Sequence, residues 1–136
     1  MNYISKSVSD TNKIASEFVK TIKKGDIVLL VADLGAGKTA FVKGVVKALG
    51  GDEEQVTSPT FTIVNEYSLD KFDIFHFDLY RLNDPNELYN IGFEEYFYGN
   101  GVCFIEWPER ASEFFDKSAK IVQIKKNGEN EREIIF

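Results

Sequence analysis

The sequence predicts an α/β fold in which helices flank a mixed central β-sheet that includes antiparallel hairpins. Two apolar runs, residues 27–31 and 102–105, have the continuous hydrophobicity of strands buried on both faces of a sheet. Amphipathic helical patterns precede and follow the first of these runs. Short polar turns separate two pairs of strand-like segments, which is typical of hairpins.

The composition limits the size and the partners of this fold. The 136 residues, 43% of them hydrophobic, suffice for one domain with a packed core but not for a second domain, so we expect a single domain over residues 1–136. The net charge of −6 argues against independent binding to nucleic acid, because contacts with phosphates need a basic face. We therefore expect another molecule to hold any RNA with which this chain works.

The single cysteine, Cys103, lies in an apolar run and provides neither a disulfide framework nor a thiolate metal site. We expect its thiol to be buried like a small hydrophobic side chain. No segment approaches the length of a membrane span, and the first residues lack the apolar core of a signal peptide. The sequence thus predicts no membrane partner and a cytoplasmic location, where ATP and Mg²⁺ are available.

The first half of the chain predicts strand, helix, strand and helix in that order. Residues 2–5 form a short strand, and the capping box from Ser7 to Asp10 begins a helix that Gly25 ends. After the strand at 27–31, a second helix ends at Gly50-Gly51. The core faces of the two helices are expected to be Ile14, Ala15, Phe18, Val19 and Ile22, and Phe41, Val42, Val45, Val46 and Leu49.

The second half predicts two hairpins around a further buried strand. Asp84 caps a short helix with Pro85 at its first position and Gly92 at its end, and residues 93–97 add one more turn. Pro108 stops the buried strand that begins at residue 102. The hairpins pair 63–68 with 72–79 across residues 69–71, and 119–125 with 132–136 across Asn127-Gly128.

A phosphate-binding loop is predicted directly after the strand at 27–31. Gly35 and Gly37 allow the backbone to approach an anion closely, so that successive N–H groups surround a β-phosphate at the start of the following helix. Lys38 supplies a positive charge for the β- and γ-phosphate oxygens, and the Thr39 hydroxyl is placed to bind Mg²⁺. The loop reads Ala32-Asp33-Leu34-Gly35-Ala36-Gly37-Lys38-Thr39.

Two carboxylates at strand ends are the candidate catalytic acids. In the strand at 72–79, His76 and Asp78 share one face, and we interpret His76 as a hydrogen-bonded core residue. A carboxylate that closes an apolar strand beside a phosphate-binding loop is suited to act on the metal or on the attacking water, which makes Asp78 a candidate. Glu106 ends the buried strand at 102–106 and is the second candidate.

Together these motifs resemble the TsaE (YjeE) family, small bacterial ATPases needed for threonylcarbamoyladenosine modification of tRNA. The resemblance covers nearly the whole chain, and the motifs occur in the family's order. The first motif is shared with many ATPases, whereas the other three together are much more specific. The four stretches are Asp33-Leu34-Gly35-Ala36-Gly37-Lys38-Thr39, Ser58-Pro59-Thr60-Phe61-Thr62, His76-Phe77-Asp78-Leu79-Tyr80-Arg81-Leu82 and Ile105-Glu106-Trp107-Pro108-Glu109.

The resemblance implies a P-loop NTPase-like sheet with helices on both sides, ATP in the loop, and Mg²⁺ held by Thr39 and Glu106. Asp78 would lie beside the γ-phosphate and act with Lys38 and Glu106 in catalysis, while Thr60 would belong to a nucleotide-sensing switch. By analogy, Thr11 would lie near the adenine. The nucleotide-binding residues implied in this way are Thr11, Asp33, Leu34, Gly35, Ala36, Gly37, Lys38, Thr39, Ala40 and Thr60. Ala32 and Ala40 depart from the family's usual Gly and Thr without removing a phosphate or metal ligand.

Members of this family act with the proteins TsaD and TsaB, which transfer the threonylcarbamoyl group to adenosine 37 of tRNA. The resemblance therefore implies that this chain resets such a complex by ATP hydrolysis and meets tRNA only indirectly. None of the arginines is positioned as a finger by its motif, so we expect slow hydrolysis by the isolated chain and acceleration by a partner.

Two other classes share the phosphate-binding loop, a small-molecule kinase and a GTPase-type switch. A kinase usually carries a lid with arginines that shields the phosphoryl group from water, but no inserted lid is apparent and the arginines are Arg81, Arg110 and Arg132. A GTPase normally reads guanine with Asn-Lys-x-Asp, and the segment at 12–15 lacks the Asp and lies too early. Adenine is therefore favoured.

Overall fold

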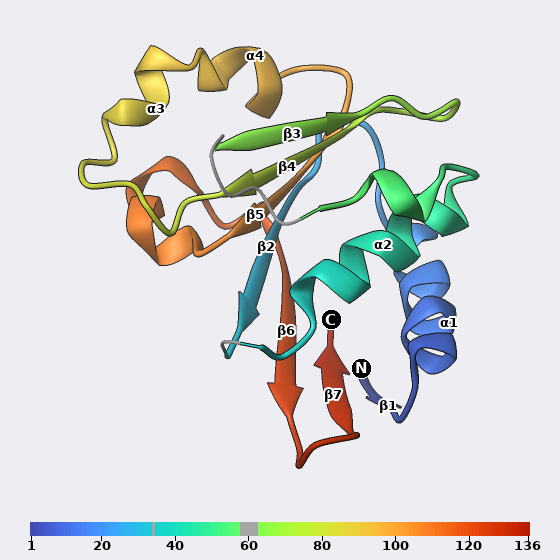
Figure 1. Cartoon of the computed structure of the whole chain (residues 1–136). Helices are drawn as coiled ribbons and strands as arrows, with labels where there is room; N and C mark the ends of the chain where they lie inside the picture. Colours follow the sequence, from blue (N-terminus) through green and yellow to red (C-terminus); the bar gives the residue numbers. More distant parts are fainter. Residues whose placement is uncertain (34, 58–62) are drawn as a thin grey trace.

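A computed structural model describes residues 1–33, 35–57 and 63–136, and the strands in these ranges form one mixed sheet (Figure 1). The order across the sheet is β1-β7-β6-β2-β5-β4-β3. This confirms the predicted α/β fold with a mixed central sheet. The strands are β1 (Asn2–Ser5), β2 (Ile27–Ala32), β3 (Val64–Tyr67), β4 (Ile74–Asp78), β5 (Val102–Glu106), β6 (Lys120–Lys126) and β7 (Arg132–Ile135).

The four central strands are parallel, which places their carboxyl ends at one edge of the sheet. β2 pairs in parallel with β5 and β6, and β4 pairs in parallel with β5. The register sets Glu106 of β5 beside Leu30 of β2 on one side and beside Asp78 of β4 on the other. The two predicted acids are therefore neighbours, next to the strand from which the phosphate-binding loop emerges. The antiparallel strands β1, β7 and β3 lie outside this centre.

Helices cover both faces of the sheet. Figure 1 shows α1 (Val8–Val19) and α2 (Lys38–Ala48) together on one side, and α3 (Glu87–Asn90) and α4 (Phe93–Phe97) on the other. Two short 3₁₀ helices, η1 (Glu53–Gln55) and η2 (Pro108–Phe114), complete the described helices. None of the helices in the described ranges has the length and apolar content that crossing a membrane would require.

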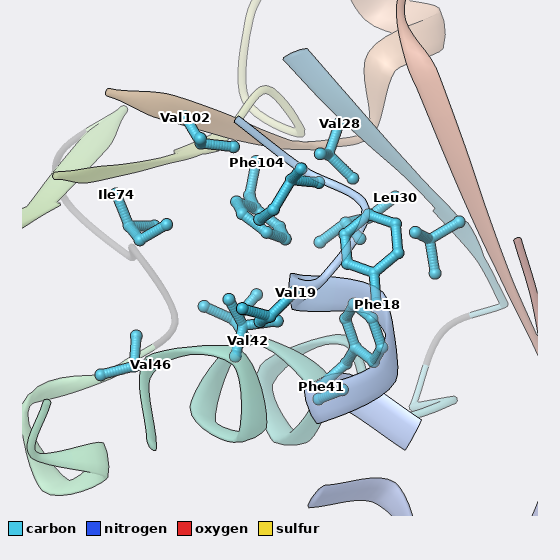
Figure 2. Close-up of a cluster of buried hydrophobic side chains, with 14 of the residues drawn as sticks. Phe18, Val19, Val28, Leu30, Phe41, Val42, Val46, Ile74, Val102 and Phe104 are labelled. Atoms are coloured by element: carbon cyan, nitrogen blue, oxygen red, sulfur yellow. The ribbon is translucent and has the colours of Figure 1, made fainter. Parts of the chain in front are cut away.

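The larger core lies between α1, α2 and the sheet (Figure 2). Phe18 of α1 is central to it: its ring centroid lies 5.6 Å from that of Phe41 on α2 and 6.3 Å from that of Phe104 on β5. Such tilted and edge-to-face aromatic contacts add to the stabilisation from apolar burial. The predicted core faces of both helices are buried here, with Leu49 packed at the margin.

The second core lies under α3 and α4 and encloses Cys103. The residue is 1% exposed, and its thiol donates a hydrogen bond to the carbonyl oxygen of Tyr96 at 3.3 Å. Burial raises the pKa of the Cys103 thiol to about 12. The prediction of a buried, hydrophobic-like cysteine is confirmed, and its thiolate form is disfavoured at neutral pH.

Two helix boundaries differ from those predicted. The first helix ends at Val19 instead of running to Gly25, because the amides of Lys20, Thr21 and Ile22 bond to carbonyls three residues earlier and tighten the chain into turns. Ile22 is nevertheless buried. Its place in the apolar pattern therefore correctly predicted that it is buried, but not that it is helical. α3 begins at Glu87, two residues after Pro85, while the Asp84 carboxylate accepts from the amide of Asn86 at 3.0 Å.

The contact between α1 and α2 depends on a residue without a side chain. A Cβ atom added at Gly44 would lie 2.9 Å from Cβ of Ala15 and 3.1 Å from Oδ1 of Asn12. Real Cβ atoms essentially never lie as close to another atom as the 2.9 Å that would separate this Cβ from Ala15. Glycine therefore allows the two helices to pack at their present separation.

We expect Gly44→Ala to lower the free energy of unfolding by about 1–3 kcal/mol, as overpacking usually does. The loss should appear although alanine gains about 1 kcal/mol over glycine in a helix. Urea denaturation measures it. Adding Ala15→Gly removes the opposing Cβ and should recover part of the loss, so the two substitutions should couple favourably. A Gly44→Ala protein as stable as the parent would contradict this account of the helix contact.

Candidate active site

The loop between β2 and α2 has the backbone conformation that its glycines predict. Gly35 has φ +75° and Gly37 φ +103°, and both values lie in the left-handed region that favours glycine. The amide of Ala36 donates to the Asp33 carbonyl at 3.0 Å, and Gly37 is the N-cap of α2. The described part of the loop therefore turns at its glycines and leads directly into the amino end of a helix, whose first backbone N–H groups have no partner within the helix and can bind an anion. Leu34 lies outside the described residues.

A cavity of about 420 Å³ lies between this loop and the carboxyl ends of β4 and β5. It brings together six of the residues predicted from the sequence, and two aromatic residues complete its wall. Asp33 is exposed and is not part of the lining. The lining residues are Gly35, Gly37, Lys38, Thr39, Asp78, Tyr80, Glu106 and Trp107.

Glu106 is the most enclosed carboxylate of the cavity. Its residue is only 4% exposed, because β5 is buried on both faces up to its last position. One carboxylate oxygen, Oε1, lies 3.6 Å from Nζ of Lys38, and the other, Oε2, lies 2.5 Å from Nε2 of His76. The charge that burial would otherwise penalise is thus paired on both oxygens.

The sequence placed His76 in the core and missed its link to the site. The residue is fully buried, as predicted, and Tyr67 of β3 lies on its other side, with Oη 3.4 Å from Nδ1. Its Nε2 contacts the Glu106 carboxylate. The signal that could have revealed this contact is the alternation along β4, which puts His76 on the face of Asp78, one step back from the acidic end of the sheet.

Asp78 lies at the mouth of the cavity and is half-buried. Burial raises the pKa of its carboxyl group. The amide of Tyr80 donates to Oδ1 at 3.0 Å and opposes this increase in the pKa, the negative charge of Glu106 adds to it, and Lys38 and His76 oppose it more weakly. Asp78 therefore carries its charge in an environment that favours the protonated acid more than water does.

Two aromatic residues at the cavity wall were not among the predicted site residues. Trp107 follows Glu106 directly, and its ring centroid lies 4.9 Å from that of Tyr80. Nζ of Lys38 lies 4.4 Å from the centre of the Trp107 ring, and Cζ of Arg110 lies 5.4 Å from that of Tyr80, both in cation–π contact. Among the described residues, Trp107 is the one non-glycine residue with positive φ, at 57°.

A second cavity, of about 240 Å³, lies on the other side of the loop. Gly37 lines both cavities, and the predicted residues Thr11, Ala36 and Ala40 line the second one. The Thr11 hydroxyl is buried and lies 2.6 Å from Oγ of Ser5. Arg132, which was not predicted, also lines this cavity and donates from Nε to the Ala36 carbonyl at 3.1 Å.

The oxygen ligands in the first cavity are suited to bind Mg²⁺ together with the phosphates of a nucleotide. Mg²⁺ prefers oxygen ligands and is usually held by one or two protein groups plus phosphate oxygens and water. The Thr39 hydroxyl and the Glu106 carboxylate line the same space as the loop glycines. Within residues 1–33, 35–57 and 63–136, no group of three or more His, Cys, Asp or Glu could bind a metal by itself. Thr60 lies outside the described residues.

We expect Asp78→Asn to raise the melting temperature of the free protein at pH 7. Because its pKa is raised on folding, the folded protein binds a proton at Asp78 more tightly than the unfolded chain does, so ionisation of this group lowers stability. The gain should shrink as the pH falls toward the ordinary aspartate pKa of about 4. Circular dichroism melts between pH 7 and pH 4 test this. Asp70→Asn, in an exposed turn, is the control, and an equal gain there would contradict the explanation.

The chain is similar in sequence to known proteins. The chain is 42% identical over 127 residues to the tRNA threonylcarbamoyladenosine biosynthesis protein TsaE of Bacillus subtilis, covering 93% of this chain and 78% of that protein. Its identity to the protein of the same name from Treponema pallidum is 37%, covering 98% of each. The Rickettsia conorii protein is 45% identical over 103 residues, which are 76% of this chain and 58% of that protein.

The fold is also shared with a solved structure. The crystal structure of YdiB from Bacillus subtilis superposes with a TM-score of 0.78 at 35% identity, covering 98% of this chain and 82% of that one. Residues 5–134 match the family described as "Threonylcarbamoyl adenosine biosynthesis protein TsaE". Sequence, fold and family match agree with the resemblance drawn from the motifs, and this chain belongs to the TsaE family.

Proposed function

We propose that this chain is a Mg²⁺-dependent ATPase that supports threonylcarbamoyladenosine modification of tRNA together with the proteins TsaD and TsaB. The observation that carries the proposal is the first cavity, where the glycine loop, Lys38, Thr39 and two carboxylates face one space. This set of groups matches what binding and hydrolysis of a nucleoside triphosphate require. The proposed role in tRNA modification is supported by the relatives, which are named as tRNA threonylcarbamoyladenosine biosynthesis proteins.

The contacts of Lys38 indicate how the site responds to a triphosphate. Lys38 is 9% exposed, and its ammonium group lies between the Glu106 carboxylate and the Trp107 ring. The β- and γ-phosphate oxygens offer it stronger anionic partners. When Lys38 turns to them, oxygen Oε1 of Glu106 becomes available to a cation beside Thr39. Bound Mg²⁺ supplies charge neutralisation on the phosphates.

Asp78 is the group suited to handle the attacking water. It lines the same cavity, and the Tyr80 amide donates to one of its oxygens, Oδ1. We assign the other oxygen to the attacking water. The loop amides and Lys38 stabilise the charge that develops on the transferred phosphoryl group. The second cavity, with Thr11, Ala36 and Ala40, is where we place the nucleoside part of ATP.

The site as described favours slow turnover without a partner. No arginine is among the described residues that line the first cavity. Arg110 stacks on Tyr80, and Arg132 lies at the second cavity. An arginine that reaches the transferring phosphoryl group accelerates hydrolysis by about 10³–10⁵-fold in P-loop enzymes. We therefore propose that the partner complex completes this site and accelerates hydrolysis.

Substitution of Lys38 and of Glu106 should separate nucleotide binding from metal-dependent chemistry. Lys38→Ala should abolish ATP binding in calorimetry, because it removes the cation for the phosphates. Glu106→Gln should keep ATP binding but lower Mg²⁺-dependent hydrolysis by roughly a hundredfold or more. Lys47→Ala, exposed on the same helix, is the control and should change neither. Unchanged Mg²⁺ dependence in Glu106→Gln would refute its assignment as a metal ligand.

Co-purification with TsaB and TsaD tests the proposed partners. We expect the three proteins to form a complex and ATP hydrolysis by the complex to exceed that of the isolated chain by tenfold or more, since a partner completes the site. A complex containing Lys38→Ala reports any ATPase activity that comes from the other subunits. Equal rates with and without the partners would remove this part of the proposal.

A further inference from the structure

We propose that His76 is a positioning residue that holds the Glu106 carboxylate in place for Mg²⁺. The inference rests on the proposed ATPase function and goes beyond it, because His76 lies behind the cavity and does not line it. It starts from a side chain that the mechanism above does not use: an imidazole that is completely buried and yet contacts the site's most enclosed carboxylate.

The hydrogen bonds define how the imidazole is oriented. A carboxylate can only accept, so the proton on Nε2 of His76 is donated to Oε2 of Glu106, at 2.5 Å. In the neutral ring Nδ1 is then the acceptor, and the single proton of the Tyr67 hydroxyl can go either to Nδ1, 3.4 Å away, or to the carbonyl oxygen of Thr57, 3.5 Å away. Three adjacent strands, β3, β4 and β5, thus contribute one residue each to a chain of polar contacts that ends at the cavity.

Glu106 depends on this contact when a nucleotide is bound. Among the described residues, its ion-pair and hydrogen-bond partners are Lys38 on Oε1 and His76 on Oε2. If Lys38 turns to the phosphates, His76 remains as the partner that limits rotation of the carboxylate. Oxygen Oε1 then faces the cavity while Oε2 stays fixed. Hydrogen-bonding partners of metal ligands typically contribute 10–100-fold to metal affinity.

A purely structural role for His76 makes a different prediction. If the residue only filled the core, any side chain that restored folding would restore Mg²⁺ binding as well. If it positions Glu106, the donor atom must reach the carboxylate. His76→Gln places an amide nitrogen as far from Cβ as Nε2 is, whereas the amide of His76→Asn reaches only the position of Nδ1. These two variants are similar in polarity and differ in whether the donor contacts Glu106.

The test measures Mg²⁺ binding without turnover. A non-hydrolysable ATP analogue is bound to each variant in EDTA, Mg²⁺ is then titrated, and the fluorescence of Trp107 is followed. Trp107 is the sole tryptophan of the chain and lines the cavity, so its emission reports on the site. Phe77→Leu is the matched control for lost packing, since Phe77 is a fully buried residue of the same strand but belongs to the core on the opposite face of the sheet.

We expect His76→Asn to raise the half-saturating Mg²⁺ concentration by about 10–100-fold and His76→Gln to remain near the parent value. Affinity for the analogue in EDTA should be the same in all variants, and Phe77→Leu should lower only the melting temperature. Equal shifts in His76→Asn and His76→Gln, no shift in His76→Asn, or an equal shift in Phe77→Leu would overturn the inference while leaving the ATPase proposal intact.

Tyr67→Phe provides the test if His76→Asn does not fold. It removes the hydroxyl that lies between Nδ1 of His76 and the carbonyl oxygen of Thr57, so it should shift the Mg²⁺ requirement in the same direction, and an unchanged requirement would overturn the inference. A parent chain that binds no analogue would instead overturn the proposed function and this inference with it.

Discussion

The buried carboxylate of Glu106 is the constraint on which the site depends. A charge this enclosed is costly unless both of its oxygens are paired, and here the pairing comes from Lys38 at the start of α2 and His76 on β4. The requirement links three elements that are distant in sequence: the glycine loop, β4 and β5. A shift of any one of them would leave a buried charge without a partner, so the compensation also holds the cavity in one shape.

The sheet topology makes this pairing possible. Parallel β2, β5 and β4 end at the same edge, which is where ligands generally bind in open α/β sheets. The antiparallel strands contribute from outside: Tyr67 of β3 approaches His76, and Arg132 of β7 donates to the carbonyl of Ala36 in the loop. The outer strands therefore support the centre in addition to closing the sheet.

Local sequence patterns were sufficient to predict most of the fold and the backbone conformation of the glycine loop. The apolar runs, the hairpin turns and the left-handed backbone of Gly35 and Gly37 follow from residue type and spacing alone. The end of α1 could not be predicted in this way. Ile22 is buried although it lies in the turns after the helix, and a pattern of buried residues does not distinguish a turn from a helix.

The side-chain partners within the site were not predicted from the sequence. The contact of His76 with Glu106 joins residues 30 positions apart, and that of Arg132 with Ala36 joins residues 96 apart. Both depend on strand order and register. Trp107 combines an aromatic side chain with positive φ, a conformation for which no local propensity argues.

The enclosure of Cys103 has a practical consequence for following the motions of this protein. Its thiol is sealed between β5 and the segment that carries Tyr96, and its high pKa leaves almost no reactive thiolate at neutral pH. A thiol reagent can therefore reach the single thiol of the chain only during rare excursions in which the α4 side lifts from the sheet. The rate of its alkylation therefore measures how often this side of the molecule opens.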